Sequence, residues 1–136
     1  MKKELLFIGA FALLSVLNSC DDKDEGSQSD TIQLSNKNIA VTDESKTIQV
    51  TTKGDSWDFY GIAEKYEGNE SLNKKIGISE RNLTELSGDW YSIKRKKKKE
   101  IEISVSENTL NTNRQLIIDL GDKNYFDAIS ILQYSK

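Results

Sequence analysis

The feature that most constrains this chain is a set of short segments in which apolar and polar residues alternate. In Glu100–Ser106 every second side chain is apolar: Ile101, Ile103 and Val105. Successive side chains of a β-strand point to opposite faces, so this period of two predicts a strand with one buried face. We expect further strands in Thr31–Leu34 and Asn38–Val41 (two halves of a first strand), Lys46–Thr52, Trp57–Glu64, Trp90–Lys94, Gln115–Leu120 and Ala128–Tyr134.

These strands predict an all-β fold, in which two sheets pack as a β-sandwich. The chain has no proline, so its hairpin turns must rely on Gly, Asn and Asp. Alternation places Trp57 and Phe59 on one face, which we assign to the core. Trp90 shares its face with Ser92 and Lys94, so we expect its ring to be the more exposed of the two indoles.

The N-terminus has the pattern of a secretory signal. Lys2 and Lys3 precede Leu5–Val16, an uncharged run that is too short for a permanent membrane helix. Leu17-Asn18-Ser19-Cys20 then resembles a lipobox. We therefore predict a lipoprotein signal peptide over residues 1–19, with lipidation of Cys20 and several acyl chains as the membrane anchor. The alternative is an ordinary signal peptide followed by a free thiol.

Residues 20–30 offer nothing to bury, and we predict a disordered tether there. The cysteine is followed directly by five charged residues: Asp21, Asp22, Lys23, Asp24 and Glu25. This run resembles the surface-export signal of lipoproteins in Bacteroidetes-type bacteria. This resemblance implies an outer-membrane lipoprotein that faces the cell exterior. A competing interpretation remains, because an Asp directly after the lipidated cysteine resembles the inner-membrane retention signal of enteric bacteria. Asp30-Thr31-Ile32 also resembles a short O-glycosylation motif, which makes Thr31 a candidate site.

Composition limits the chemistry of the remaining domain, residues 31–136. The chain has no histidine and only one cysteine, which excludes Ser-His-Asp and Cys-His nucleophiles and ordinary zinc sites. A net charge of −3 gives no general attraction to nucleic acid. Asp55, Asp58, Glu64 and Glu67 could form a glycosidase pair only across a cleft, and no cleft is expected. We therefore expect no enzyme activity, cofactor or metal.

Four segments follow one another in an order that is similar to a known family. They are the Thr47–Thr52 strand before Trp57, the Trp90–Ile93 strand, Ile101–Asn108 before a loop to Arg114, and the terminal Ala128–Gln133 strand. This order resembles the BACON domain, an immunoglobulin-like β-sandwich common in secreted and surface proteins of Bacteroidetes. The likeness covers Ile32 to Gln133, and its most specific parts are Glu107-Asn108…Arg114 and the terminal Gln133. The polar stretch 65–89 is longer than the family pattern.

The resemblance implies a module that binds glycan or mucin, or a spacer. Carbohydrate modules stack exposed aromatic rings on sugars, and the candidates here are Trp90, Tyr91, Tyr60, Tyr125 and Phe126. We place Tyr125 and Phe126 in a loop after Gly121–Asn124. Our first expectation is a surface lipoprotein that binds carbohydrate or another extracellular polymer. The alternative is a structural spacer, or a protein-docking lipoprotein associated with a glycan-uptake complex.

A run of six cations stands where the family has a Gly-rich turn: Lys94, Arg95, Lys96, Lys97, Lys98 and Lys99. Like charges this close repel one another, so the run belongs in water, at the tip of a hairpin. It is a candidate contact for an acidic polysaccharide, a lipopolysaccharide phosphate or an acidic partner. Alternatively, it is a solvated tip that blocks edge-to-edge strand pairing.

Overall fold

The computed structural model describes residues 29–136. The predicted signal peptide, Cys20 and the acidic residues 21–25 lie outside this range. Nine strands form the described part: β2 (Asn38–Val41), β3 (Lys46–Thr51), β4 (Asp58–Tyr66), β5 (Lys74–Gly77), β6 (Glu85–Ser87), β7 (Tyr91–Lys96), β8 (Glu100–Val105), β9 (Arg114–Asp122) and β10 (Tyr125–Gln133). A short 3-10 helix, Glu70–Leu72, joins β4 to β5.

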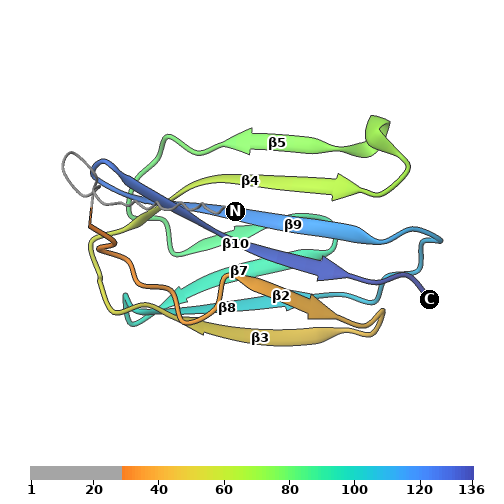
Figure 1. Cartoon of the computed structure of the whole chain (residues 1–136), viewed down its shortest axis with the longest axis horizontal. Helices are drawn as coiled ribbons and strands as arrows, with labels where there is room; N and C mark the ends of the chain where they lie inside the picture. The colour runs from red at the N-terminus through yellow and green to blue at the C-terminus, as the bar shows by residue number, and fades with distance from the viewer. Residues whose placement is uncertain (1–28) are drawn as a thin grey trace, which may run out of the picture.

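The strands form two sheets, as the sequence predicted. One sheet has the order β2-β10-β9-β4-β5, and Figure 1 shows its strands side by side from β5 at the top to β2. The second has the order β3-β8-β7-β6. All neighbouring strands are antiparallel except β2 and β10, which are parallel. The fold is therefore a two-sheet β-sandwich.

The core lies between the sheets and follows the predicted alternation. The expected inward residues of β8, β9 and β10 are fully buried or nearly so: Ile101, Ile103, Val105, Leu116, Ile118, Leu120, Ile129 and Ile131. Trp57 and Phe59 are each 1% exposed, which confirms their assignment to the core. Their rings meet edge to face, with 5.3 Å between the centroids.

The first predicted strand differs from expectation, because the chain changes sheets within it. Leu34 makes only an isolated bridge to Thr52, at the end of β3. Four residues later β2 pairs with β10 in the other sheet. Thr31–Leu34 is therefore not a strand. The stretch 65–89 ends β4 and then supplies β5 and β6, which are edge strands of different sheets. No helix within residues 29–136 is long and apolar enough to span a membrane.

The two ends of the sandwich carry different segments. The proximal end, where the described chain begins, holds residues 30–33, the β3–β4 loop 52–57, the β7–β8 hairpin 97–99 and the β9–β10 hairpin 122–125. The distal end holds the β2–β3 and β8–β9 loops and the C-terminus.

Candidate functional site

Two of the aromatic candidates for sugar stacking are buried, so these predictions are wrong. Trp90 and Tyr91 are each 6% exposed. Tyr91 begins β7 and faces the core with Ile93. Trp90 precedes the strand, and the alternation that should have turned it outward does not apply there. Its ring packs edge to face on Tyr91, with 5.3 Å between the centroids.

The inward-turned indole belongs to a buried polar cluster around Glu64, which is 4% exposed. The Tyr66 hydroxyl donates to Glu64 Oε1 at 2.7 Å, and the Tyr91 hydroxyl donates to Oε2 at 3.2 Å. Trp90 Nε1 donates to the Tyr66 hydroxyl at 3.0 Å. Burial, followed by the charge of Glu64, raises the pKa of Tyr91 to about 12. The two hydroxyls therefore donate to both oxygens of Glu64, so this side chain links β4 to β7 in the interior.

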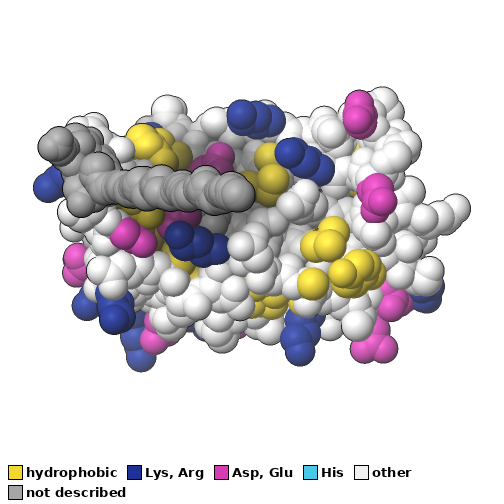
Figure 2. Space-filling model, in the orientation of Figure 1, with side chains coloured by type: hydrophobic (Ala, Val, Ile, Leu, Met, Phe, Trp, Pro, Cys, Tyr) yellow, Lys and Arg dark blue, Asp and Glu magenta, His cyan; other side chains and the backbone are white. Residues whose placement is uncertain are grey.

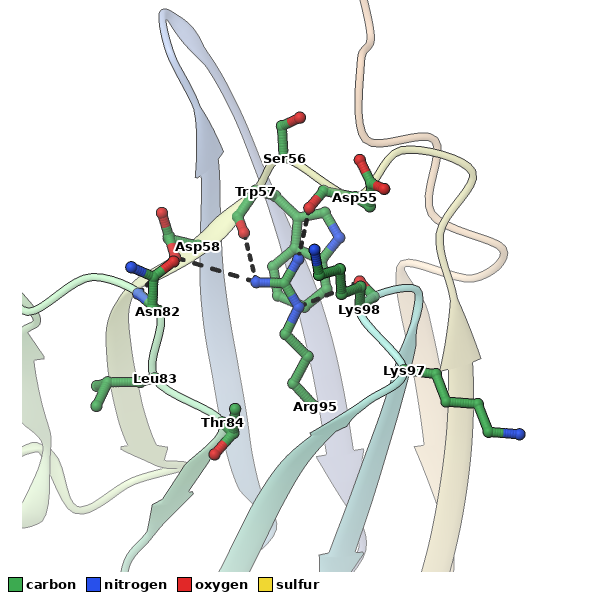
Figure 3. Close-up of a pocket in the computed structure, with 10 residues that line it drawn as sticks. All are labelled: Asp55, Ser56, Trp57, Asp58, Asn82, Leu83, Thr84, Arg95, Lys97 and Lys98. Carbon is green, nitrogen blue, oxygen red and sulfur yellow. Dashed lines mark hydrogen bonds and ion pairs between the residues drawn. The ribbon is translucent and has the colours of Figure 1, made fainter.

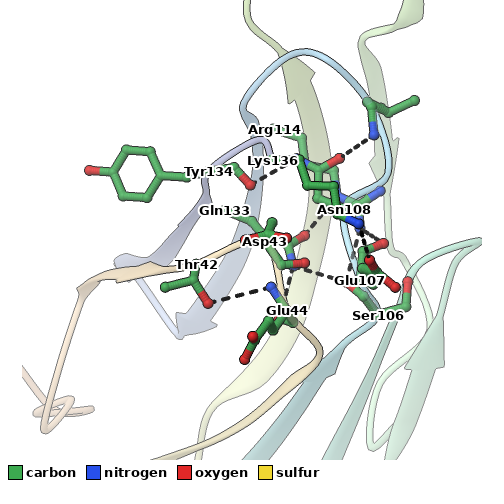
Figure 4. Close-up of polar contacts among 11 residues, drawn as sticks. Thr42, Asp43, Glu44, Ser106, Glu107, Asn108, Arg114, Gln133, Tyr134 and Lys136 are labelled. Carbon is green, nitrogen blue, oxygen red and sulfur yellow. Dashed lines mark hydrogen bonds and ion pairs between the residues drawn. The ribbon is translucent and has the colours of Figure 1, made fainter.

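The residues that mark the family resemblance also stabilise the fold (Figure 4). Arg114 lies with its guanidinium 4.0 Å from the centre of the Trp90 ring and donates through Nε to Gln133 Oε1 at 2.8 Å. Gln133 in turn donates to the Ser106 carbonyl at 2.9 Å. Asn108 Nδ2 donates to the carbonyls of Thr112 and Tyr134 at 3.0 and 3.1 Å. These side chains satisfy backbone carbonyls where the strands end at the distal end.

One aromatic group is exposed on the outer face of the five-stranded sheet. Phe126 is 58% exposed and meets Tyr60 edge to face, with 5.2 Å between the centroids and 85° between the planes. The Arg81 guanidinium lies 3.8 Å from the centre of the Tyr60 ring. Gly121 lies beneath both rings, because a Cβ there would come within 2.7 Å of each. We call Tyr60, Phe126, Arg81 and Gly121 the aromatic cluster.

The predicted loop position of Tyr125 and Phe126 is wrong, because both residues begin β10. The pairing of Phe126 with Gly121 holds the phenyl ring over β9. Tyr125 is half-buried against the core and donates its hydroxyl to Asp127 at 3.2 Å. Of the five aromatic candidates, Phe126 and Tyr60 thus lie together at the surface, and the other three belong to the interior or its rim.

The outer face beyond the aromatic cluster is partly apolar (Figure 2). Asp119 is paired with both Gly61 and Ala128, so it lies two residue pairs along the strands from Phe126, on the same face. Further along, the face carries half-buried apolar side chains: Ala63, Ile117, Ala128 and Leu132. A carboxylate and a guanidinium group therefore flank the aromatic cluster.

The six-cation run forms the end of β7 and the β7–β8 hairpin, but Arg95 is not a surface cation. Its side chain is 9% exposed, and its guanidinium lies 3.6 Å from the centre of the Trp57 ring (Figure 3). It donates to the carbonyls of Trp57 at 2.6 Å, Asp55 at 2.9 Å and Lys98 at 3.1 Å. Burial lowers the pKa of Arg95, although Asp58 and Asp55 oppose this effect. The prediction of an anion contact at Arg95 is therefore wrong.

The other five cations remain exposed. Lys96 pairs with Glu102 at 2.6 Å, and this contact raises the pKa of Lys96. Lys97 and Lys98 form the turn with φ of 52° and 63°, in the left-handed region that disfavours side chains with a Cβ. The hairpin borders a depression of about 380 Å³ (Figure 3), in which Asp55 and Asp58 offset the lysine charges.

The remaining predicted residues are placed as follows. Thr31 is exposed at the proximal end, where glycosylation would be sterically open. Asp58 begins β4, whereas Glu64 and Glu67 lie toward its other end, so these carboxylates do not form one site. Within residues 29–136, no three His, Cys, Asp or Glu side chains gather as a metal site.

Comparison with solved structures adds one finding about the fold. The NMR structure of a protein from Bacteroides thetaiotaomicron is similar, with a TM-score of 0.63 and 20% sequence identity over 86% of this chain and 98% of that one. This chain is an immunoglobulin-like β-sandwich. At this identity the likeness concerns the fold alone. No protein-family model and no curated protein matches the chain.

Proposed function

We propose that this protein is a cell-surface lipoprotein, anchored through Cys20, whose sandwich is a non-catalytic carbohydrate-binding module. The proposed contact is the aromatic cluster. The observation that carries this proposal is Phe126, an apolar ring that is 58% exposed although its position is fixed by Tyr60 and by the strand backbone. The resemblance to BACON domains, which remains a prediction, leads to the same class of function.

The chemistry of the cluster suits a sugar ring. A pyranose presents C–H groups on its faces and hydroxyls at its edge, so it needs an apolar platform flanked by hydrogen-bonding groups. Phe126 offers the platform, while Asp119 and Arg81 offer charged partners for hydroxyls. Because the phenyl ring already packs against Tyr60, binding would cost little side-chain entropy.

A glycan array probed with the mature chain, carrying Cys20→Ala so that it stays in solution, tests the binding function. We expect retention on at least one class of oligosaccharide. Absence of binding to all plant, mucosal and bacterial glycans on the array would contradict the proposal.

Two variants test the anchor and its location. Cys20→Ala in cells should abolish acyl labelling and membrane fractionation, and a labelled mutant in the membrane pellet would contradict lipidation. Replacement of Asp24 and Glu25 by Ala should reduce digestion by protease added to intact cells while total protein stays constant. Unchanged digestion would remove the export-signal interpretation.

A protein-docking role is the second candidate, and one observation favours it. The Phe126 and Tyr60 rings meet at 85° rather than lying coplanar, and the outer face beyond them carries the half-buried apolar side chains of Ile117 and Leu132. A docking role predicts that Ile117→Glu abolishes chemical cross-linking of the protein to a partner on the cell surface. Phe126→Ala should have a smaller effect on that cross-linking. The opposite order would favour glycan binding.

A further inference from the structure

The basic hairpin lies beside the point where the chain enters the domain. Ile32 is fully buried, and its carbonyl accepts hydrogen bonds from the amides of Lys53 at 3.0 Å and Gly54 at 3.2 Å. Thr52, which precedes Lys53 in the chain, donates its amide to the carbonyl of Lys99 at 2.9 Å. The first described residues are therefore fixed beside the β7–β8 turn, at the proximal end.

Five exposed lysines lie at this end, together with the carboxylates of Asp30, Asp55 and Asp58. Lys97, Lys98 and Lys99 form the turn, Lys53 lies in the adjoining β3–β4 loop, and Lys123 forms the neighbouring β9–β10 hairpin. We call these five residues the basic tip. The distal end carries six exposed or half-buried carboxylates, against the four exposed lysines Lys46, Lys65, Lys74 and Lys136. These carboxylates are Asp43, Glu44, Glu67, Glu70, Asp89 and Glu107. Carboxylates therefore outnumber lysines at the distal end.

The two ends are far apart compared with the range of electrostatic attraction. β9 has nine residues and spans about 30 Å between the ends. The Debye length at physiological salt is about 8 Å, so a charged surface at one end does not act on the other. Residues 21–30 can separate the domain from Cys20 by at most about 36 Å, whatever path they take. A lipid on Cys20 would therefore keep the proximal end within about 36 Å of the headgroups.

The turn is formed by residues that are not the best suited to its backbone conformation. A hairpin turn with positive φ at successive residues is best formed by Asn and Gly, which tolerate that region. Lys97 and Lys98 occupy it at a cost in backbone energy. Such strain is characteristic of contact sites.

We infer that the basic tip binds the anionic headgroups of the membrane that holds the lipid, so that the domain stands with its distal end outward. This inference rests on the proposed anchor at Cys20. It leaves the outer face of the five-stranded sheet, with the aromatic cluster, on the flank of the standing domain.

A fluorophore experiment on the lipidated chain tests the orientation. Lipidation consumes the only cysteine thiol, so Asn124→Cys at the proximal end or Thr109→Cys at the distal end introduces a single labelling site. Each labelled chain is reconstituted into vesicles of phosphatidylcholine alone, or mixed with phosphatidylglycerol, that contain a headgroup-linked quencher. We expect quenching at position 124 but not 109, and only with phosphatidylglycerol. Equal quenching at both positions, or no dependence on phosphatidylglycerol, would overturn the inference.

Charge variants test the same contact without the anchor. The mature chain carrying Cys20→Ser is sedimented with the two kinds of vesicle. Replacement of Lys97, Lys98 and Lys99 by Gln should weaken binding to phosphatidylglycerol vesicles about 100-fold, since each lysine near an anionic surface contributes about fivefold. The matched control replaces Lys46, Lys65 and Lys75, which are exposed and lie outside the basic tip, and it should bind like the unmodified chain.

The outcomes separate the inference from the proposed anchor. Failure of the lipidated chain to enter vesicles would contradict the anchor and, with it, the inference. Entry into vesicles together with equal sedimentation of both triple variants would overturn the inference alone. Retention on an acidic-polysaccharide column without vesicle binding would also overturn it, and would assign the basic tip to a soluble polyanion.

Discussion

Arg95 offers a sharp test of how this domain is held together. Arg95→Ala removes a guanidinium that lies over the buried Trp57 ring and donates to three carbonyls. The bond to the Trp57 carbonyl is partly buried, and a charge-assisted bond of that kind contributes about 2 kcal/mol. The two exposed bonds contribute about 0.5 kcal/mol each after solvent screening, and the cation–π contact contributes about 1 kcal/mol. The expected loss is about 4 kcal/mol.

Thermal unfolding followed by circular dichroism measures this loss. At about 4 °C per kcal/mol for a domain of this size, the midpoint should fall by about 15 °C. Lys94→Ala is the matched control, because Lys94 is the preceding residue of the same strand and is exposed. Its midpoint should change by less than about 2 °C. Equal midpoints for the two variants would refute the assignment of Arg95 as an interior residue.

Three further perturbations test other parts of the structure. Ile103→Asp places a carboxylate at a fully buried position, and the penalty is several kcal/mol against a total stability of about 5–15 kcal/mol. Circular dichroism should show an unfolded chain, and a native spectrum would contradict the strand register. Lys97→Asn with Lys98→Gly should raise the free energy of unfolding by about 1 kcal/mol in urea titration, because both φ values are positive; a decrease would contradict the turn geometry. Tyr91 favours its neutral form in the folded state, so its contribution to stability is complete below pH 10 and is lost as pH rises toward about 12. Tyr91→Phe should therefore flatten the decline of the unfolding midpoint over this pH range. The same decline in both proteins would contradict the raised pKa of Tyr91.

The interior strands could be predicted from the sequence, because each buries one face and therefore alternates. β8 is the clearest case, and its three inward residues are almost completely buried. β5 could not be found in this way. All four of its residues are exposed, so an edge strand of this kind has no buried face to leave a pattern. Its position is set by pairing with β4, a long-range contact that local composition does not reveal.

The candidate site was harder to predict, because side chains of one type take different roles. Charge groups Arg95 with its lysine neighbours, yet it shares strand parity with Tyr91 and Ile93, which face inward. Trp90 was assigned by parity although it lies just outside the strand. The pairing of Phe126 with Gly121, which leaves room for the exposed rings, depends on the β9–β10 register and has no local signal.

The most direct test of the account compares two exposed aromatic residues in binding to the strongest glycan from the array. Phe126→Ala removes the proposed platform, whereas Tyr134→Ala removes a ring that is 47% exposed and lies just beyond β10 at the distal end. Isothermal calorimetry should show affinity reduced at least about tenfold for Phe126→Ala, as for a residue at the centre of a contact, and unchanged for Tyr134→Ala. Unchanged affinity for Phe126→Ala, with the fold intact by circular dichroism, would contradict carbohydrate binding at the aromatic cluster.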